Sequence, residues 1–305
     1  MTARGQLAGA DAPANAGKAG GSIVNAMTID VEDYFQVSAF DAVVRREAWA
    51  DFPSRVVANT EKILAIFSEH RVRATFFVLG WVAERFPSIV ASIAAAGHEL
   101  ASHGFMHRLV YEQTPDAFRD DVRRAKALIE DQAGQTVRGY RAPSYSITRK
   151  SLWALDVLVE EGYAYDASIF PIRHDRYGIP DAPRHPHSLK RAAGELAEAP
   201  PSTVRMGSMN LPVAGGGYFR LLPYGWTRWG IARINAKEKQ PAVFYLHPWE
   251  IDPEQPRLQA SALSRFRHYR HLDKTEGRLR RLLGDFRFGR LDAVISGTIP
   301  GGGSC

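Results

Sequence analysis

Short apolar runs alternate with amphipathic segments along most of the chain. Runs rich in β-branched and aromatic residues predict strands, and these cover residues 23–29, 74–79, 98–101, 137–140, 163–166 and 242–246. Apolar positions at helical spacing, bounded by Ser, Pro and Gly, predict helices over residues 54–67, 81–96, 114–132 and 148–161. Pro87 is expected to break the second helix. The alternation predicts parallel strands joined by crossover helices, in a barrel or a doubly wound sheet.

The two ends of the chain differ from the rest in composition. Residues 1–22 are rich in Ala and Gly without periodicity, and a Gly-rich run closes the chain, so we expect a disordered tail at 1–22 and a flexible tail at 297–305. The first residues contain no apolar run of signal-peptide length, and no stretch of about 18 apolar residues occurs anywhere. We therefore expect no transmembrane segment and a cytoplasmic location.

Composition narrows the function classes. With 305 residues, 45% of them hydrophobic and 24% charged, the chain can form one large α/β domain and is unlike a fibrous or disordered protein. The net charge of +6 and the pI of about 9.5 suit an anionic partner, but no nucleic-acid recognition motif accompanies them, so we expect no nucleic-acid partner. Cys305 is the single cysteine, so a metal would need His and carboxylate ligands.

The segment 257–290 is strongly basic. It carries ten Lys or Arg against three Asp or Glu, with apolar residues at helical spacing. A solvated basic helix packed on the domain is the plainer interpretation. Binding to an anionic glycan, or peripheral contact with a membrane surface, is the alternative.

Acidic and histidine residues follow the predicted strands. Asp30, Glu32 and Asp33 come at the end of the first strand, and three neighbouring carboxylates repel one another unless they share a cation or a proton. An acidic loop or a helix cap is the alternative. His103 and His107 follow the strand 98–101 and are spaced four apart, so both could reach one metal ion; a surface or core pair is the alternative.

Two further strand ends carry candidate site residues. Arg141 follows the strand 137–140 and could hold a carboxylate by a bidentate pair, or it could be a surface arginine before a Pro turn. His247 follows the strand 242–246 and could act as a general acid or be a structural histidine. Asp166, which ends the strand 163–166, could orient it.

Taken in chain order, these groups resemble the motifs of the polysaccharide deacetylase family, also called carbohydrate esterase family 4 or the NodB homology domain. The family pattern is an acidic T-x-D segment, an H-[ST]-x-x-H-like pair, R-x-P, an Asp-containing segment and L-x-H. Here these motifs are Thr28–Asp33, His103–His107, Arg141–Pro143, Asp166–Phe170 and Leu246–His247. The resemblance covers about residues 23–250 and implies a deformed (β/α) barrel of about seven parallel strands.

The C-terminal part carries a second resemblance. The segments His247–Glu250, Phe266–Tyr269 and Asp285–Gly289 are similar to a subfamily found with bacterial exopolysaccharide synthesis loci. This likeness implies a role in exopolysaccharide biosynthesis. We expect residues 251–296 to form a basic, helical C-terminal extension of the deacetylase domain.

The resemblance implies one divalent metal ion, held by His103, His107 and a carboxylate of the first motif. Zn²⁺ is expected, and Fe²⁺, Co²⁺, Ni²⁺ and Mn²⁺ also suit such a donor set. The family usually has a second Asp directly after the first, but Val31 stands there, so the ligand is Glu32 or Asp33. Strand alternation puts Glu32 on the same side as the first acid, whereas a bend would present Asp33.

The resemblance also implies the catalytic roles. Asp30 would be the general base, oriented by Arg141, and His247 would be the general acid, tuned by Asp166. The residues expected to bind the substrate are Pro143, Tyr145 and Trp249. The backbone N–H of Tyr145 would bind the oxyanion.

The implied activity is a metal-dependent hydrolysis of linear amide C–N bonds, which removes N-acetyl groups from an amino-sugar polysaccharide or its precursor. Two positions depart from the family: Gly104 stands where Ser or Thr is common, and Phe170 is expected to replace a Trp of the site wall. The alternative functions are a small-molecule amide or ureide hydrolase of the same fold, and a non-catalytic carbohydrate-binding protein.

Overall fold

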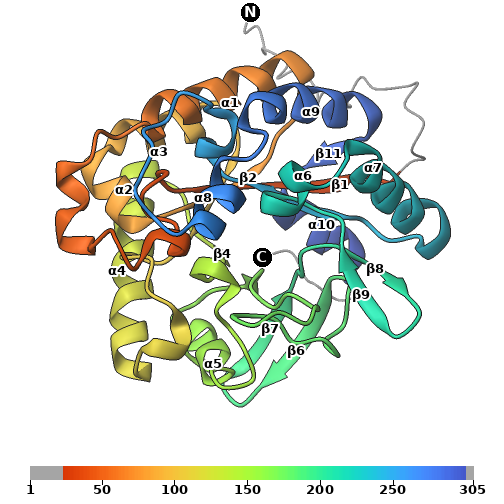
Figure 1. Cartoon of the computed structure of the whole chain (residues 1–305). Coiled ribbons are helices and arrows are strands. Elements are labelled where there is room, and N and C mark those ends of the chain that lie inside the picture. Colours follow the sequence, from red (N-terminus) through yellow and green to blue (C-terminus); the bar gives the residue numbers. More distant parts are fainter. Residues whose placement is uncertain (1–22, 300–305) are drawn as a thin grey trace, which may run out of the picture.

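A mostly parallel nine-stranded sheet forms the centre of the computed structural model, which describes residues 23–299 (Figure 1). The strand order is β10-β1-β2-β3-β4-β5-β7-β6, and β11 pairs with the start of β1. The strands are β1 (Asn25–Val31), β2 (Thr75–Val78), β3 (Glu99–Ser102), β4 (Gly139–Tyr140), β5 (Tyr165–Asp166), β6 (His187–Arg191), β7 (Gly194–Glu198), β10 (Val243–Leu246) and β11 (Phe288–Gly289). A separate hairpin pairs β8 (Thr203–Met206) with β9 (Met209–Pro212).

The parallel strands curve into a barrel. From β10 through β1 to β5 and β7, every neighbouring pair is parallel, and β6 alone is antiparallel to its neighbour β7. The ring closes beside Ser202, whose amide donates to the carbonyl of Val243 at 3.1 Å and whose Oγ accepts from the Val243 amide at 2.7 Å. The predicted deformed barrel of parallel strands is therefore confirmed.

Side-chain alternation along β1 separates two environments. Met27, Ile29 and Val31 belong to the main hydrophobic core beneath the outer helices, whereas Ala26 belongs to a smaller cluster that includes Phe77 and Tyr165. Because side chains alternate across a strand, Asp30 is on the same side of β1 as Ala26. The inner face thus changes from apolar to acidic toward the carboxyl end of the strand.

Helices cover the outside of the barrel. In Figure 1, α1 to α4 lie at the top and left of the view, the hairpins β6–β7 and β8–β9 lie at the bottom and lower right, and α8 is near the centre. The helices are α1 (Val56–His70), α2 (Gly80–Arg85), α3 (Pro87–Ala95), α4 (Pro115–Ala133), α5 (Trp153–Glu160), α6 (Gly216–Leu221), α7 (Tyr224–Arg233), α8 (Ala262–Tyr269), α9 (Leu272–Asp285) and α10 (Leu291–Thr298). The predicted helical C-terminal region is present as α8 to α10.

Two details of the sequence prediction change, and one is confirmed. The helix predicted at 148–161 begins at Trp153. The helix predicted at 81–96 is divided before Pro87, as expected. The flexible tail predicted from residue 297 begins too early, because α10 extends to Thr298. The tails at 1–22 and 300–305 lie outside the described residues. Within 23–299, no helix has the length and apolar character needed to cross a membrane.

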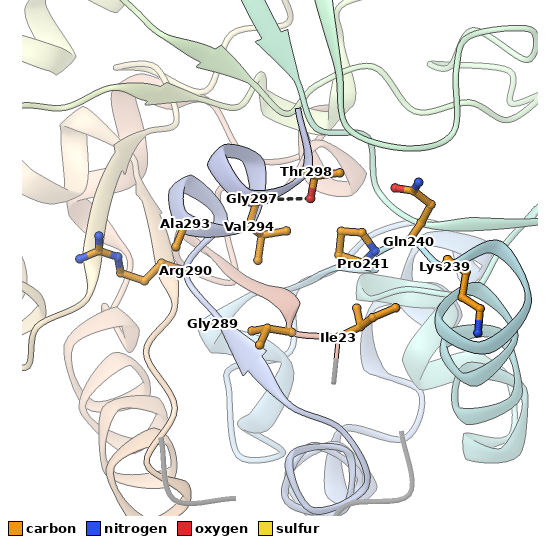
Figure 2. A pocket seen from close by; sticks show the side chains of 11 residues that line it. Ile23, Lys239, Gln240, Pro241, Gly289, Arg290, Ala293, Val294, Gly297 and Thr298 are labelled. Carbon is orange, nitrogen blue, oxygen red and sulfur yellow. Dashed lines mark hydrogen bonds between the residues drawn. The ribbon is translucent and has the colours of Figure 1, made fainter. Parts of the chain in front are cut away.

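A cavity of about 510 Å³ lies at the amino ends of β1 and β10, where α10 packs against the barrel (Figure 2). Its lining is Ile23, Val24, Lys239, Gln240, Pro241, Gly289, Arg290, Ala293, Val294, Gly297 and Thr298. Thr298 Oγ1 donates to the carbonyl of Val294 at 2.7 Å. No acidic or histidine side chain belongs to this lining. None of the predicted catalytic or metal-binding residues therefore lies in this cavity.

Candidate functional site

A second cavity, of about 470 Å³, opens at the carboxyl ends of the parallel strands. Side chains that follow several different strands meet in its wall. Its lining includes Asp30 and Glu32 from β1, His103 and His107 after β3, Tyr145 after β4, and His247 and Trp249 after β10. Reactive groups collect at this end of (β/α) barrels, and the sequence-predicted residues are brought together there.

Arg141 holds Asp30 at the base of this cavity. Its Nη1 donates to Oδ1 of Asp30 at 2.6 Å and to Oγ1 of Thr28 at 2.8 Å. The guanidinium carbon lies 4.2 Å from the centre of the Phe77 ring, and the arginine is fully buried. Burial lowers the pKa of Arg141, but the charge of Asp30, the hydrogen bond to Asp30 and the neighbouring tyrosines together raise it above its ordinary value. The pair therefore fixes the orientation of the Asp30 carboxylate.

Glu32, His103 and His107 form a buried triad whose ligand atoms lie within 4.8 Å of one another. Nδ1 of His103 is 2.8 Å from the carbonyl of Arg141, which leaves Nε2 for the cavity. Oε2 of Glu32 lies 2.8 Å from Nε2 of His107, yet it is a buried acceptor without a hydrogen bond of normal geometry. Because such an acceptor is costly unless it is compensated, the triad fits a metal ion.

The protonation states also suit a metal. Burial would raise the pKa of Glu32, but His107 and His247 lower it to about 2. Burial lowers the pKa of His103 to about 4. An ionised carboxylate and a neutral imidazole are the forms that bind metals. Glu32 and His103 could therefore bind a metal ion without a change in their charge state.

The loop between the two histidines is shaped by Asp121 of α4. The Asp121 carboxylate accepts from the amides of Phe105 at 2.7 Å and Met106 at 3.3 Å. Gly104 has φ +72°, and a Cβ added there would lie 2.8 Å from Oδ2 of Asp121. The family's common Ser or Thr does not fit this close approach, which explains the glycine. His107 follows at φ 51°, and this turn directs it back toward His103.

Asp33 is not a member of the triad. Its Oδ2 accepts from the amides of Arg55 at 2.9 Å and Val56 at 3.2 Å and from the hydroxyl of Ser54. These amides are at the start of α1, so Asp33 caps a helix more than twenty residues later in the chain. Glu32 is thus the carboxylate of the triad. The helix predicted from residue 54 begins at Val56, and Ser54 at the start of the predicted range donates to Asp33 and does not cap α1.

His247 is oriented by Glu250 and not by Asp166. Nδ1 of His247 lies 2.7 Å from Oε1 of Glu250, and the Arg220 Nε donates to Oε2 of Glu250 at 2.6 Å. The other ring nitrogen of His247 faces the site, 3.8 Å from Oδ2 of Asp30. Burial would lower the pKa of His247, but Glu32 and Glu250 raise it to about 9.

Asp166 has other partners, which corrects the prediction that it tunes His247. Its carboxylate accepts from the hydroxyl and amide of Ser168. Burial raises the pKa of Asp166, and burial together with the charge of Asp166 raises the pKa of its neighbour Glu198 well above the ordinary range. The two buried acids therefore interact with each other, behind the wall of the cavity.

The predicted substrate-binding residues divide into three cases. Tyr145 lines the cavity, but its amide donates to the carbonyl of Ala142 at 3.1 Å, so the predicted oxyanion donor already has a partner. Trp249 also lines the cavity, and its Nε1 donates to Oε1 of Glu32 at 3.3 Å. Pro143 is buried and does not belong to the lining.

Sequence reasoning missed several residues of this cavity. The missed lining residues are His174, Arg176, Tyr177, Arg220, Arg267 and His268. Glu250, which lies behind His247, was missed as well. A local signal existed only for Glu250, because an acid three residues after His247 fits a capping box, and the His247 amide does donate to its carboxylate at 3.1 Å. The others come from segments whose approach to the site depends on the tertiary fold.

The family model described as "Polysaccharide deacetylase" matches residues 40–163. Residues 40–163 are therefore similar to polysaccharide deacetylases. Directly after it, the model "Domain of unknown function (DUF3473)" matches residues 167–296. The deacetylase match contains both histidines of the triad, whereas His247 and Glu250 lie within the second match.

Named relatives show the same likeness. The chain is similar to a peptidoglycan-N-acetylglucosamine deacetylase of Bacillus cereus, with 35% identity over 98 residues, or 32% of this chain and 36% of the relative. It is also similar to a chitooligosaccharide deacetylase of a Bradyrhizobium species, with 33% identity over 111 residues, or 36% of this chain and 48% of the relative. The chain thus spans between a third and a half of the length of these relatives.

A solved structure extends the likeness to most of the fold. The structure of a putative polysaccharide deacetylase from Mycobacterium smegmatis superimposes with a TM-score of 0.62, covering 92% of this chain and 93% of that one, at 21% identity. At this identity the comparison shows a shared fold. It confirms that the barrel and the following helical region belong to one known arrangement.

Proposed function

We propose that this polysaccharide deacetylase relative is a metal-dependent hydrolase that removes N-acetyl groups from an amino-sugar polysaccharide or its precursor. One observation carries the proposal: the Asp30–Arg141 pair, the metal-binding triad and His247 meet in one cavity at the carboxyl ends of the strands. The names of the relatives, which are deacetylases of peptidoglycan and chitooligosaccharides, support hydrolysis of an N-acetyl amide bond.

The resident metal is proposed to be Zn²⁺, held by Glu32, His103 and His107. Two imidazoles and one carboxylate are typical zinc ligands, and Fe²⁺, Co²⁺, Ni²⁺ and Mn²⁺ accept the same donors. The chemistry that a divalent metal supplies when bound is Lewis acidity, which lowers the pKa of water and polarises a carbonyl.

Asp30 and His247 divide the proton transfers between them. The Asp30 carboxylate, fixed by Arg141, accepts a proton from the water whose oxygen adds to the acetamide carbon. Nε2 of His247 donates a proton to the sugar nitrogen as the C–N bond breaks, so the products are acetate and a free amine. Glu250 keeps Nδ1 of His247 as a donor, which leaves Nε2 free to face the substrate.

The biological context is proposed to be exopolysaccharide synthesis. The support is the sequence likeness of the segments around His247, Phe266 and Asp285 to a subfamily from such loci. These segments lie within residues 167–296, which match the domain of unknown function. The role in exopolysaccharide synthesis is therefore a proposal separate from the deacetylation reaction.

The reaction is tested by acetate release from N-acetylglucosamine oligomers with Zn-loaded full-length protein. We expect the variants His103→Ala and Asp30→Asn to reduce kcat by at least about 10²-fold. His187→Ala and Asp181→Asn are matched controls outside the cavity and should leave kcat unchanged. Metal content is measured on every sample, and we expect it to fall in His103→Ala but not in Asp30→Asn.

The other outcomes point to the alternative functions. A tightly bound metal without acetate release would favour a small-molecule amide or ureide hydrolase. Neither metal nor acetate release would favour a carbohydrate-binding protein. Full activity of Asp30→Asn would contradict the role given to Asp30.

A further inference from the structure

We infer that this cavity takes a saccharide that carries an anionic group, and that Arg176 and Arg267 bind this group. The inference rests on the proposed deacetylase function and adds a substrate class to it. Its basis is the distribution of charge in the lining of the cavity.

The acids of the lining are already engaged. The carboxylates of the lining are Asp30 and Glu32, and both are buried. Asp30 is paired with Arg141, and Glu32 contacts His107 of the triad. Of the lining arginines, Arg220 is also buried and is bound to Glu250. The base of the cavity is therefore balanced in charge by its own side chains.

The positive charge at the mouth of the cavity is not balanced by acidic side chains. Arg176 and Arg267 line it and are exposed, and no ion pair with a carboxylate joins either guanidinium anywhere in residues 23–299. The polar contacts of Arg176 are to neutral groups, the Ser38 carbonyl at 3.5 Å and the Tyr111 hydroxyl. On the outer surface, by contrast, exposed arginines such as Arg149 do pair with acids.

The two arginines act on the same place although they come from distant segments. Both line the same cavity as His174. Burial lowers the pKa of His174, the charge of Asp175 raises it, and the charges of Arg267 and Arg176 lower it. Asp175 contacts Nδ1 of His174 at 3.0 Å but does not belong to the lining. Two guanidinium groups without an acidic partner in one lining are suited to a carboxylate or a phosphate.

An aromatic surface lies beside these charges. The rings of His174 and Tyr177 stack with centroids 3.8 Å apart and planes 14° apart, and Tyr177 in turn stacks on the buried Phe170. Flat rings of this kind suit the apolar face of a sugar. A sugar on this surface would present a carboxylate or phosphate substituent to the two arginines.

The test measures binding of probes without an acetyl group, so that its result does not depend on catalysis. One pair of probes is a glucuronate tetrasaccharide and its neutral glucose counterpart; the second pair is glucose 1-phosphate and glucose. Dissociation constants are measured by calorimetry on the full-length, Zn-loaded protein at about 50 mM and about 300 mM salt. The first pair reports recognition of a carboxylate, and the second reports recognition of a phosphate.

We expect one anionic probe to bind about tenfold more tightly than its neutral counterpart, and this ratio to fall at high salt. The double variant Arg176→Gln/Arg267→Gln should lose the preference. Arg265→Gln, an exposed arginine of α8 outside the lining, should keep it. Equal binding within both pairs, or a preference that survives in the double variant, would overturn the inference. Failure of acetate release alone would affect only the proposed function.

Discussion

Replacing Glu250 by Gln tests whether His247 depends on a buried carboxylate. In the wild type, this carboxylate accepts hydrogen bonds from Nδ1 and the amide of His247 and from Nε of Arg220. Glutamine keeps the shape but has only one acceptor oxygen. Its NH₂ group must therefore face either Arg220 or His247, both of which are donors.

The structure sets the size of both effects. Glu250 is fully buried and Arg220 is 3% exposed as a side chain, and removing one partner of a buried ion pair costs about 3–5 kcal/mol. Since the three carbonyls around Nη1 of Arg220 remain, we expect about 3 kcal/mol of stability to be lost. If the NH₂ group faces Nδ1, the imidazolium form is disfavoured, and we expect kcat to fall about 10²-fold or more.

The assay is initial-rate acetate release at several substrate concentrations, with unfolding in urea measured on the same samples. Because the role of His247 is in the transition state, kcat and kcat/KM should fall together while KM changes little. Glu238→Gln is a matched control, since Glu238 also lies between an arginine and a histidine, Arg184 and His185, but outside the cavity. A folded Glu250→Gln protein with kcat within about threefold of the wild type would refute the reasoning.

Three further predictions address stability. Asp33→Ala should lower the free energy of unfolding in urea by about 1–2 kcal/mol through loss of the α1 cap, with metal content unchanged; loss of the metal would contradict this. Burial raises the pKa of Glu99 from 4.5 to about 7. The folded state therefore holds an extra proton between these values, and stability should fall by roughly 3 kcal/mol as pH rises from about 4 to 8. Urea unfolding at both pH values should show a smaller loss of stability in Glu99→Gln than in the wild type. If the variant loses as much stability between the two pH values as the wild type does, another group is responsible. Adding Zn²⁺ at 100 times its Kd should stabilise the wild type by about 2.7 kcal/mol, and equal stabilisation of Glu32→Gln would argue against the triad.

Six parallel strands of the barrel could be predicted from the sequence because each is a buried run. The run 242–246 became β10 and the run 74–79 became β2 with small changes at their ends. The strands β6 to β9 were missed because they are partly exposed, and β6 to β8 also carry charged residues, as in His187–Arg191. A strand of this kind has no apolar period to distinguish it from a loop.

The sequence could predict those site residues that lie at or just after the end of a predicted strand. Asp30, His103 and His247 were found in this way, and β1 alternation correctly favoured Glu32 over its neighbour. The role of Asp33 as a helix cap could not be predicted, because the start of α1 at residue 56 comes close to Asp33 only in the folded protein. The partner of His247 was misassigned to an acid at another strand end, although the capping-box spacing three residues after His247 indicated Glu250.

The central place of β1 in the sheet has a consequence for the order of folding. Thr28 of β1 bonds the carbonyl of Phe244, 216 positions later in the chain, so one side of this strand has no partner until most of the polypeptide has left the ribosome. Such high contact order slows folding and leaves an unpaired strand edge during synthesis. Because Asp30 and Glu32 follow the same strand, catalytic competence should be among the last properties that the nascent chain acquires.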